Sequence, residues 1–142
     1  IFVLIIFLQI TLGAFVSGLD AGEIYQTWPL MNNNYLPDDT DFKTITLSNI
    51  FYNHSLIQFL HRNIAYIIFV YSVLISINVF YNKKKYLYAP LFFLLFMIFV
   101  QISLGIMALI SGLNIIYASM HQISTIFLLL SSINFYHKSI IR

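Results

Sequence analysis

Four long apolar stretches, separated by polar segments, dominate the pattern of the chain. They run from Ile1 to Leu19, from about Leu56 to Tyr81, from about Tyr88 to Leu113, and from about Ile115 to Tyr136. Each is close to the roughly 20 residues that an α-helix needs to cross a bilayer. An open strand cannot satisfy its backbone hydrogen bonds in lipid, so we interpret all four stretches as helices. The pattern therefore predicts an all-α membrane protein with four transmembrane helices.

The composition agrees with a membrane protein. Hydrophobic residues make up 60% of the 142 residues and charged residues only 8%, whereas soluble domains contain about 25% charged residues. The length fits a single domain over residues 1–142, with membrane lipid as its first partner. A net charge of +2 gives no sign of nucleic-acid binding, and the lack of cysteine excludes disulfides, thiolate haem ligation and iron–sulfur clusters within this sequence.

Charged residues separate the two sides of the predicted membrane domain. Lys83, Lys84 and Lys85 lie between the second and third helices, and Lys138 and Arg142 follow the fourth. All five acidic residues lie in the connection after the first helix. The positive-inside rule therefore predicts that the lysine turn and the C-terminus face the cytoplasm. The first residue, Ile1, already belongs to an apolar run without a basic leader, so we expect the chain to be the C-terminal part of a longer protein.

The connection between the first and second helices, from Asp20 to about Ser55, is too long for a simple link, so it is a candidate functional loop. Two prolines and a run of three asparagines favour turns in it. Tyr25 and Trp28 are candidates for the aromatic belt at the headgroups. A short helix is predicted around Leu47–Tyr52.

An internal repeat links the first and third helices. The segment Gln9-Ile10-Thr11-Leu12-Gly13 recurs as Gln101-Ile102-Ser103-Leu104-Gly105, and Ser17-Gly18-Leu19 recurs as Ser111-Gly112-Leu113. Each copy precedes a helix that carries a histidine near its start, which predicts two helical hairpins in parallel orientation. We expect the glutamines to hydrogen-bond between helices and the small residues to mark close helix packing.

His61 and His121 are the candidate functional residues within the membrane. Lys83 follows His61 by about 22 residues and Lys138 follows His121 by about 17 residues, which correspond to roughly 33 Å and 25 Å of helix. Both histidines therefore lie in the outer half of the bilayer at similar depth. An ionisable residue inside a membrane helix is costly and is a functional candidate. Two of them at one depth suggest a shared ligand.

Haem is the ligand that suits this histidine pair. Neutral imidazole binds iron, copper and zinc, but zinc needs three or four protein ligands, and this sequence offers two membrane histidines, no cysteine, and acidic residues only in the loop. Haem supplies four nitrogens and needs one or two axial ligands, here His61 and His121. Arg62, next to His61, is able to pair with a haem propionate. The alternatives are histidines that are merely hydrogen-bonded at the interface, and an Arg62 that extends to the lipid headgroups.

Several ordered segments together resemble the heme A synthase family. They are Gly13 to Gly22, then Tyr25, Thr27 and Pro29-Leu30-Met31, and further on Gln58 to Arg62, Gln101 to Gly105, and His121-Gln122. In that family two four-helix halves form an eight-helix protein, and this chain is similar to the C-terminal half of the proteobacterial and mitochondrial type. The resemblance covers nearly the whole chain.

The resemblance implies an oxidoreductase that converts the C8 methyl of heme O to a formyl group, making heme A for cytochrome oxidase. It implies that His61 and His121 are the axial iron ligands of a haem b, with Arg62 beside it, and that the missing N-terminal half holds the substrate haem, so this part alone is inactive. Heme O synthase and oxidase assembly factors are the implied partners. The implied location is the inner (plasma) membrane, or the mitochondrial inner membrane in a eukaryote. The roles of Asp20, Glu23 and Trp28 stay open, as do two alternatives: a bis-histidine electron carrier, and a non-enzymatic assembly or transport protein.

Overall fold

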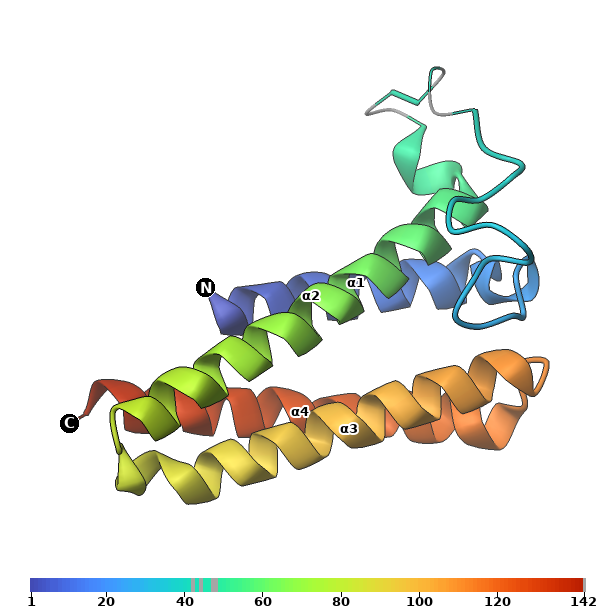
Figure 1. The fold of residues 1–142 in the computed structure, drawn as a ribbon. Helices are drawn as coiled ribbons and strands as arrows, with labels where there is room; N and C mark the ends of the chain where they lie inside the picture. Colours follow the sequence, from blue (N-terminus) through green and yellow to red (C-terminus); the bar gives the residue numbers. More distant parts are fainter. Residues whose placement is uncertain (42, 44, 47–48, 142) are drawn as a thin grey trace.

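The computed structural model describes residues 1–41, 43, 45–46 and 49–141 of the chain. These residues form four α-helices, α1 (Phe2–Gly18), α2 (His54–Tyr81), α3 (Tyr88–Ile110) and α4 (Ile115–Ile140) (Figure 1). They also form three short 3₁₀ helices, η1 (Ala21–Glu23), η2 (Ile50–Tyr52) and η3 (Lys85–Leu87). The predicted all-α fold with four helices is confirmed.

Three of the helical segments are long and apolar enough to cross a membrane. These are α2, η3 together with α3, and α4, with mean hydropathies of 2.1, 2.6 and 1.3. The helix α1 is apolar but shorter, at 17 residues. Large apolar side chains cover the outer faces, among them Phe69, Val70, Phe96 and Ile126, each more than half exposed. Such a surface suits lipid and not water, and the chain is a multi-pass membrane protein.

Two helix ends differ by three or more residues from the predicted bounds. The third helix stops at Ile110 instead of Leu113, because Gly112 and Leu113 adopt left-handed backbone angles, with φ of 69° and 58°. Gly112 therefore serves the turn between α3 and α4 and not helix packing. At the other end, α4 continues past Tyr136 to Ile140, since nothing in Tyr136 to Ile140 breaks a helix.

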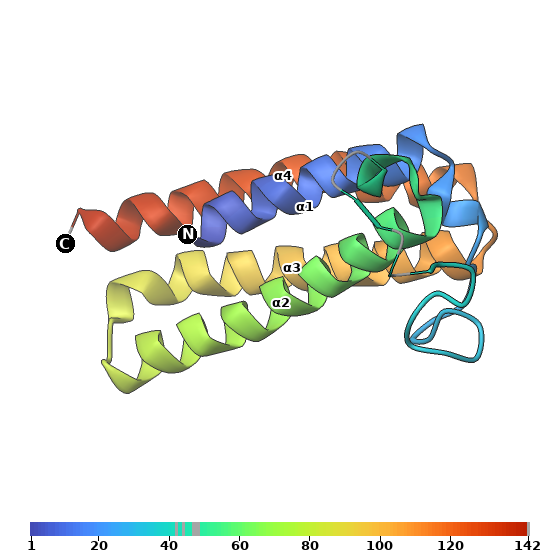
Figure 2. The same ribbon diagram turned by 90° about the horizontal axis from the view of Figure 1, so that it is seen from above.

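The helices form two antiparallel hairpins that lie side by side (Figure 1). One hairpin is α1 with α2, the other is α3 with α4, and α1 and α3 run in the same direction, as the internal repeat predicted. In the view from above, α1 lies beside α4 and α2 beside α3 (Figure 2). The two histidine-bearing helices, α2 and α4, therefore face each other diagonally across the bundle.

Apolar and polar layers divide the bundle along its length. The buried apolar cluster lies toward the end where α2 turns into α3; it contains Phe2, Ile6, Ile68, Val79, Leu87, Leu91, Leu94, Met97, Ile98, Leu128 and Phe135. The lysine turn and the end of α4 lie at this same end of the molecule. The next layer of each helix holds glutamines and histidines instead, and the long loop lies beyond it. Burial of the apolar cluster thus fixes the bundle at one end and leaves the other end for the polar side chains.

The loop between α1 and α2 is only partly as predicted. The helix expected around Leu47–Tyr52 appears as the single turn η2, while Leu47, Ser48 and Arg142 lie outside the described residues. Met31 and Asn34 exchange two backbone hydrogen bonds, of 2.8 Å and 3.2 Å, which close a tight turn. Trp28 is 46% exposed, but Tyr25 is only 1% exposed. The prediction that Tyr25 belongs to the headgroup belt was wrong, because its ring is buried within the loop.

Candidate functional site

His61 and His121 occupy equivalent positions in the two hairpins. Each lies about two turns inside its helix, His61 in α2 and His121 in α4, and each is half-buried. They are near enough to interact electrostatically. Because α2 and α4 run in the same direction (Figure 1) and each histidine lies about two turns from its helix start, both lie toward the same end of the bundle.

The imidazole of His121 is held in a defined orientation. Its Nδ1 lies 3.1 Å from the backbone carbonyl of Gln101 in α3. A carbonyl only accepts, so Nδ1 carries the hydrogen and Nε2 keeps its lone pair. The side chain of Gln101 donates to the Thr125 hydroxyl at 2.8 Å and to the His121 carbonyl at 3.2 Å. A histidine whose second nitrogen donates to a carbonyl is the usual arrangement of a metal ligand.

His61 is held more loosely by the matching glutamine. The Gln9 side-chain amide donates to the His61 carbonyl at 3.0 Å, and its nitrogen lies 3.4 Å from His61 Nε2. The other ring nitrogen, Nδ1, is buried without a hydrogen-bond partner. The glutamines of both repeats thus bridge the helices of their hairpins, as predicted.

Unpartnered polar atoms gather around His61. Within the part of the chain that the structure describes, four buried side-chain atoms lack hydrogen-bond partners: Gln9 Oε1, Gln58 Oε1, His61 Nδ1 and Arg62 Nε. Buried polar groups in proteins are nearly always paired. Because all four lie on one patch of the α1–α2 hairpin, the patch has the character of a binding site for a polar or metal-containing group.

Arg62 connects α2 to the long loop. Its Nη2 donates to the Tyr25 carbonyl at 2.9 Å and its Nη1 to the Leu30 carbonyl at 3.3 Å. Gln58, one turn earlier, also donates to the Tyr25 carbonyl at 2.9 Å. The arginine therefore has a role that the sequence did not reveal, namely to hold the loop over the His61 end of the bundle. Its Nε remains available to a further acceptor.

A second set of hydrogen bonds holds the far side of Tyr25. Its hydroxyl donates to Asp38 at 2.5 Å and Asp39 at 2.8 Å, and accepts from the Asp38 backbone N–H at 3.1 Å. Burial and these carboxylates raise the pKa of Tyr25 to about 12. Burial by itself raises the pKa of Asp39, but hydrogen bonds from Ser55, Tyr25 and Thr40 outweigh burial, so that the pKa of Asp39 is lowered. Tyr25 thus joins the loop to α2, where Ser55 donates to Asp39 at 2.6 Å.

The donor set fits haem better than a bare metal ion. Among the described residues, no three His, Cys, Asp or Glu side chains gather as a metal site. The histidine pair instead offers two nitrogens on facing helices, one with its tautomer fixed and one with an unpartnered buried nitrogen. Two imidazoles are sufficient for a haem, whose porphyrin supplies the other four nitrogens.

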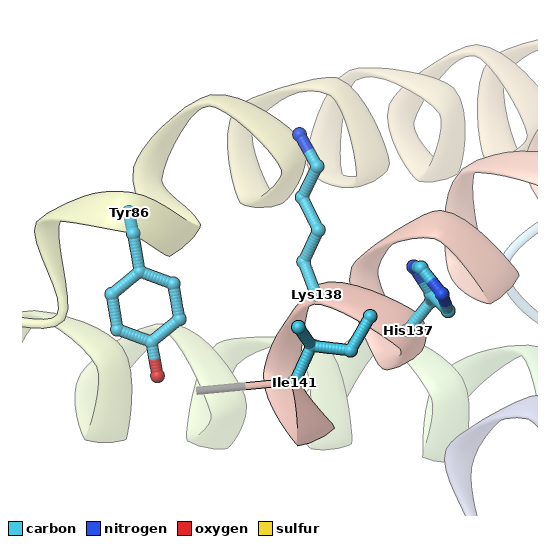
Figure 3. A pocket seen from close by; sticks show the side chains of 4 residues that line it. All are labelled: Tyr86, His137, Lys138 and Ile141. Atoms are coloured by element: carbon cyan, nitrogen blue, oxygen red, sulfur yellow. The ribbon is translucent and has the colours of Figure 1, made fainter.

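Two cavities of about 300 Å³ and 320 Å³ lie at the opposite end of the bundle from the histidines. Figure 3 shows the first, lined by Tyr86, His137, Lys138 and Ile141. Their volumes are at the lower end of the roughly 300 to 1,000 Å³ of typical ligand pockets, and the unpartnered polar atoms gather near His61 instead. We therefore place the candidate site at the histidines. Of the other loop candidates, Asp20 and Glu23 are exposed.

Fold and site together define a multi-pass helical membrane protein with paired histidines in a polar layer between two repeated hairpins. The model of the cytochrome oxidase assembly protein family COX15-CtaA matches residues 1–133. The chain belongs to this family.

Curated relatives in this family are named heme A synthase. The protein from Pelagibacter ubique is 45% identical over 127 residues, which are 89% of this chain and 37% of that protein. The proteins from Wolbachia pipientis and Rickettsia africae are 36% and 38% identical over 95% and 88% of this chain. The chain thus spans about 37% of the length of these relatives. No solved structure gives a significant match.

Proposed function

We propose that this chain forms the haem b-binding half of a heme A synthase, in which His61 and His121 are the axial ligands of the iron. The observation that carries the proposal is the matched pair of half-buried histidines on α2 and α4, within a family whose relatives bear that name. The chain spans 37% of the length of the Pelagibacter ubique relative, which agrees with the proposal that it is one part of an eight-helix bundle.

The residues of this chain have three tasks in the proposal. His61 and His121 supply nitrogen lone pairs, and the Gln101 carbonyl keeps the proton of His121 on Nδ1. Arg62, whose Nε is unpartnered, offers a positive charge and a donor to a haem propionate. Arg62 and Gln58 also hold the loop beside the His61 end through the Tyr25 carbonyl. A haem b bound here supplies a one-electron carrier.

The proposed reaction takes place on a different haem. Converting the C8 methyl of heme O to a formyl group is formally a four-electron oxidation with the addition of one oxygen atom, so it requires an electron acceptor. In the proposal the substrate haem belongs to the N-terminal half of the full protein, and this half alone is inactive. Heme O synthase and oxidase assembly factors are the proposed partners. The proposed location is the bacterial plasma membrane, or the mitochondrial inner membrane in a eukaryote.

Expression of the full-length protein in a host that makes heme O but no heme A tests this function. Extracted haems are separated by chromatography, and the proposal predicts heme A with the wild-type protein and a strong loss with His61→Ala or His121→Ala. A bis-histidine haem spectrum without any heme A would indicate an electron carrier instead. Neither spectrum nor product would indicate a non-enzymatic membrane protein.

A further inference from the structure

Each histidine packs against a glycine of the preceding helix. A Cβ added at Gly13 would lie 3.2 Å from Cε1 of His61, and one added at Gly105 would lie 3.0 Å from Cε1 of His121. Carbon atoms in good contact are about 3.5 to 4.0 Å apart. A side chain at either position would therefore require the imidazole ring to shift by a few tenths of an ångström. The two glycines allow the rings to lie directly against the helix backbone.

The glycine and the glutamine of each repeat act on the same histidine. They are four residues apart, so they lie on one face of their helix. Gln9 donates to the His61 carbonyl at 3.0 Å and Gln101 to the His121 carbonyl at 3.2 Å. Each motif therefore contacts both the backbone and the ring of its histidine. The same arrangement occurs in both hairpins, which have different loops, so the overall connection of the chain does not account for it.

We propose that the two segments Gln9 to Gly13 and Gln101 to Gly105 are positioning elements that fix the ring orientation of the haem ligands. The glutamine holds the histidine backbone, and the glycine sets where the ring lies. This inference rests on the proposed function, because it treats His61 and His121 as ligands. Replacing a group that orients a ligating histidine typically weakens metal binding by about 10- to 100-fold.

The two positioning elements differ in how strongly they constrain the ring of their histidine. At Gly105 the added Cβ would also lie 3.4 Å from Nδ1 of His121, the atom bound to the Gln101 carbonyl. At Gly13 the corresponding distance to Nδ1 of His61 is 3.7 Å, and that atom has no hydrogen-bond partner. A side chain at Gly105 thus disturbs a hydrogen-bonded ring, while one at Gly13 disturbs a ring with more freedom. We expect the larger effect from Gly105→Ala.

The test compares Gly13→Ala and Gly105→Ala with Gly18→Ala in the full-length protein purified with its haem. Gly18 is the matched control, because an added Cβ there meets nothing within 4 Å. The measurements are the highest g value of the ferric haem b in electron paramagnetic resonance, which reports the angle between the two imidazole planes, and the rate of haem transfer to an apo-acceptor. We expect a shifted g value and about tenfold or more weaker haem binding in the first two variants, and wild-type behaviour in Gly18→Ala.

Gln9→Leu and Gln101→Leu form a second pair of variants. Unlike the glycine variants they add no Cβ against the imidazole ring, so they do not prevent folding through a collision with it. They too are expected to shift the g value. Wild-type g values and transfer rates in both pairs would overturn the inference, as would equal changes in Gly18→Ala. A wild-type protein without a bis-histidine haem b would instead contradict the proposed function, so the two failures are distinguishable.

Discussion

The substitution Tyr25→Phe should release the long loop from the bundle. It removes a single hydroxyl that donates to Asp38 and Asp39 and accepts from the Asp38 N–H, while the ring and its burial stay. Hydrogen bonds to charged groups contribute about 1.5 to 3 kcal/mol each, and neutral ones about 1 kcal/mol. The two carboxylates share the single hydroxyl proton, so we count one charged bond to them and one neutral bond from the Asp38 N–H, or about 2.5 to 4 kcal/mol in total.

That loss corresponds to roughly 60- to 700-fold more frequent opening of the loop, at about 1.4 kcal/mol per factor of ten. Hydrogen–deuterium exchange of the peptides that cover residues 21–41 measures it directly. Tyr52→Phe is the matched control, because Tyr52 is 77% exposed. Exchange in Tyr25→Phe within twofold of the wild-type rate would refute the view that this hydroxyl holds the loop.

Three further predictions concern charge. If Arg62 pairs with a propionate, Arg62→Gln lowers the reduction potential of the haem b by several tens of millivolts, because the Coulomb energy is near 2 kcal/mol at roughly 8 Å and an effective dielectric of about 20. Arg62→Lys keeps the charge and lowers the potential less. Overlapping redox titrations of the wild-type, Gln and Lys proteins would limit Arg62 to holding the loop. The pKa of Tyr25 is about 12 against an ordinary value near 10, so the protonated hydroxyl stabilises the docked loop below pH 10, and this stabilisation is lost as the pH rises toward 12. The pKa of Asp39 is lowered, so its carboxylate stabilises the docked loop above about pH 4, and this stabilisation is lost at lower pH. The protection factor of the loop amides, which is the intrinsic exchange rate at each pH divided by the observed rate, should therefore be largest between these limits, and a flat profile of this factor would contradict the assignment. A reporter fused near Lys84 should be cytoplasmic and one near Asp39 external, and the reverse result would place the histidines at the other side.

The helices, their pairing and the histidine layer could be predicted because each rests on local sequence. Apolar length determines where a membrane helix can be, and the repeat of Gln9 to Gly13 in Gln101 to Gly105 revealed two equivalent hairpins. The interhelical role of the glutamines followed from the cost of an unpaired amide in lipid. Gly18 shows the limit of such patterns, since it belongs to the repeat yet has no side-chain neighbour near its Cβ position.

The role of the loop could not be predicted, because its contacts join residues far apart in the chain. Tyr25 resembled a belt residue, and only the folded loop brings Asp38 and Asp39 to its hydroxyl. The sequence left a haem propionate and the lipid headgroups as candidate partners of Arg62, whereas in the structure its two outer nitrogens donate to the carbonyls of Tyr25 and Leu30. Backbone carbonyls carry no signature in a sequence, so contacts of this kind become visible only in the structure.

The central claim is that His61 and His121 ligate a haem b. The most direct test is the reduced-minus-oxidised spectrum, with haem content from the pyridine haemochrome, of the full-length protein carrying His61→Ala or His121→Ala. His54→Ala and His137→Ala are the controls, since these two histidines lie at the ends of α2 and α4, away from the polar layer. We expect the first two variants to lose or weaken the haem b signal and the controls to keep it. An unchanged haem b spectrum and content in both His61→Ala and His121→Ala would contradict it.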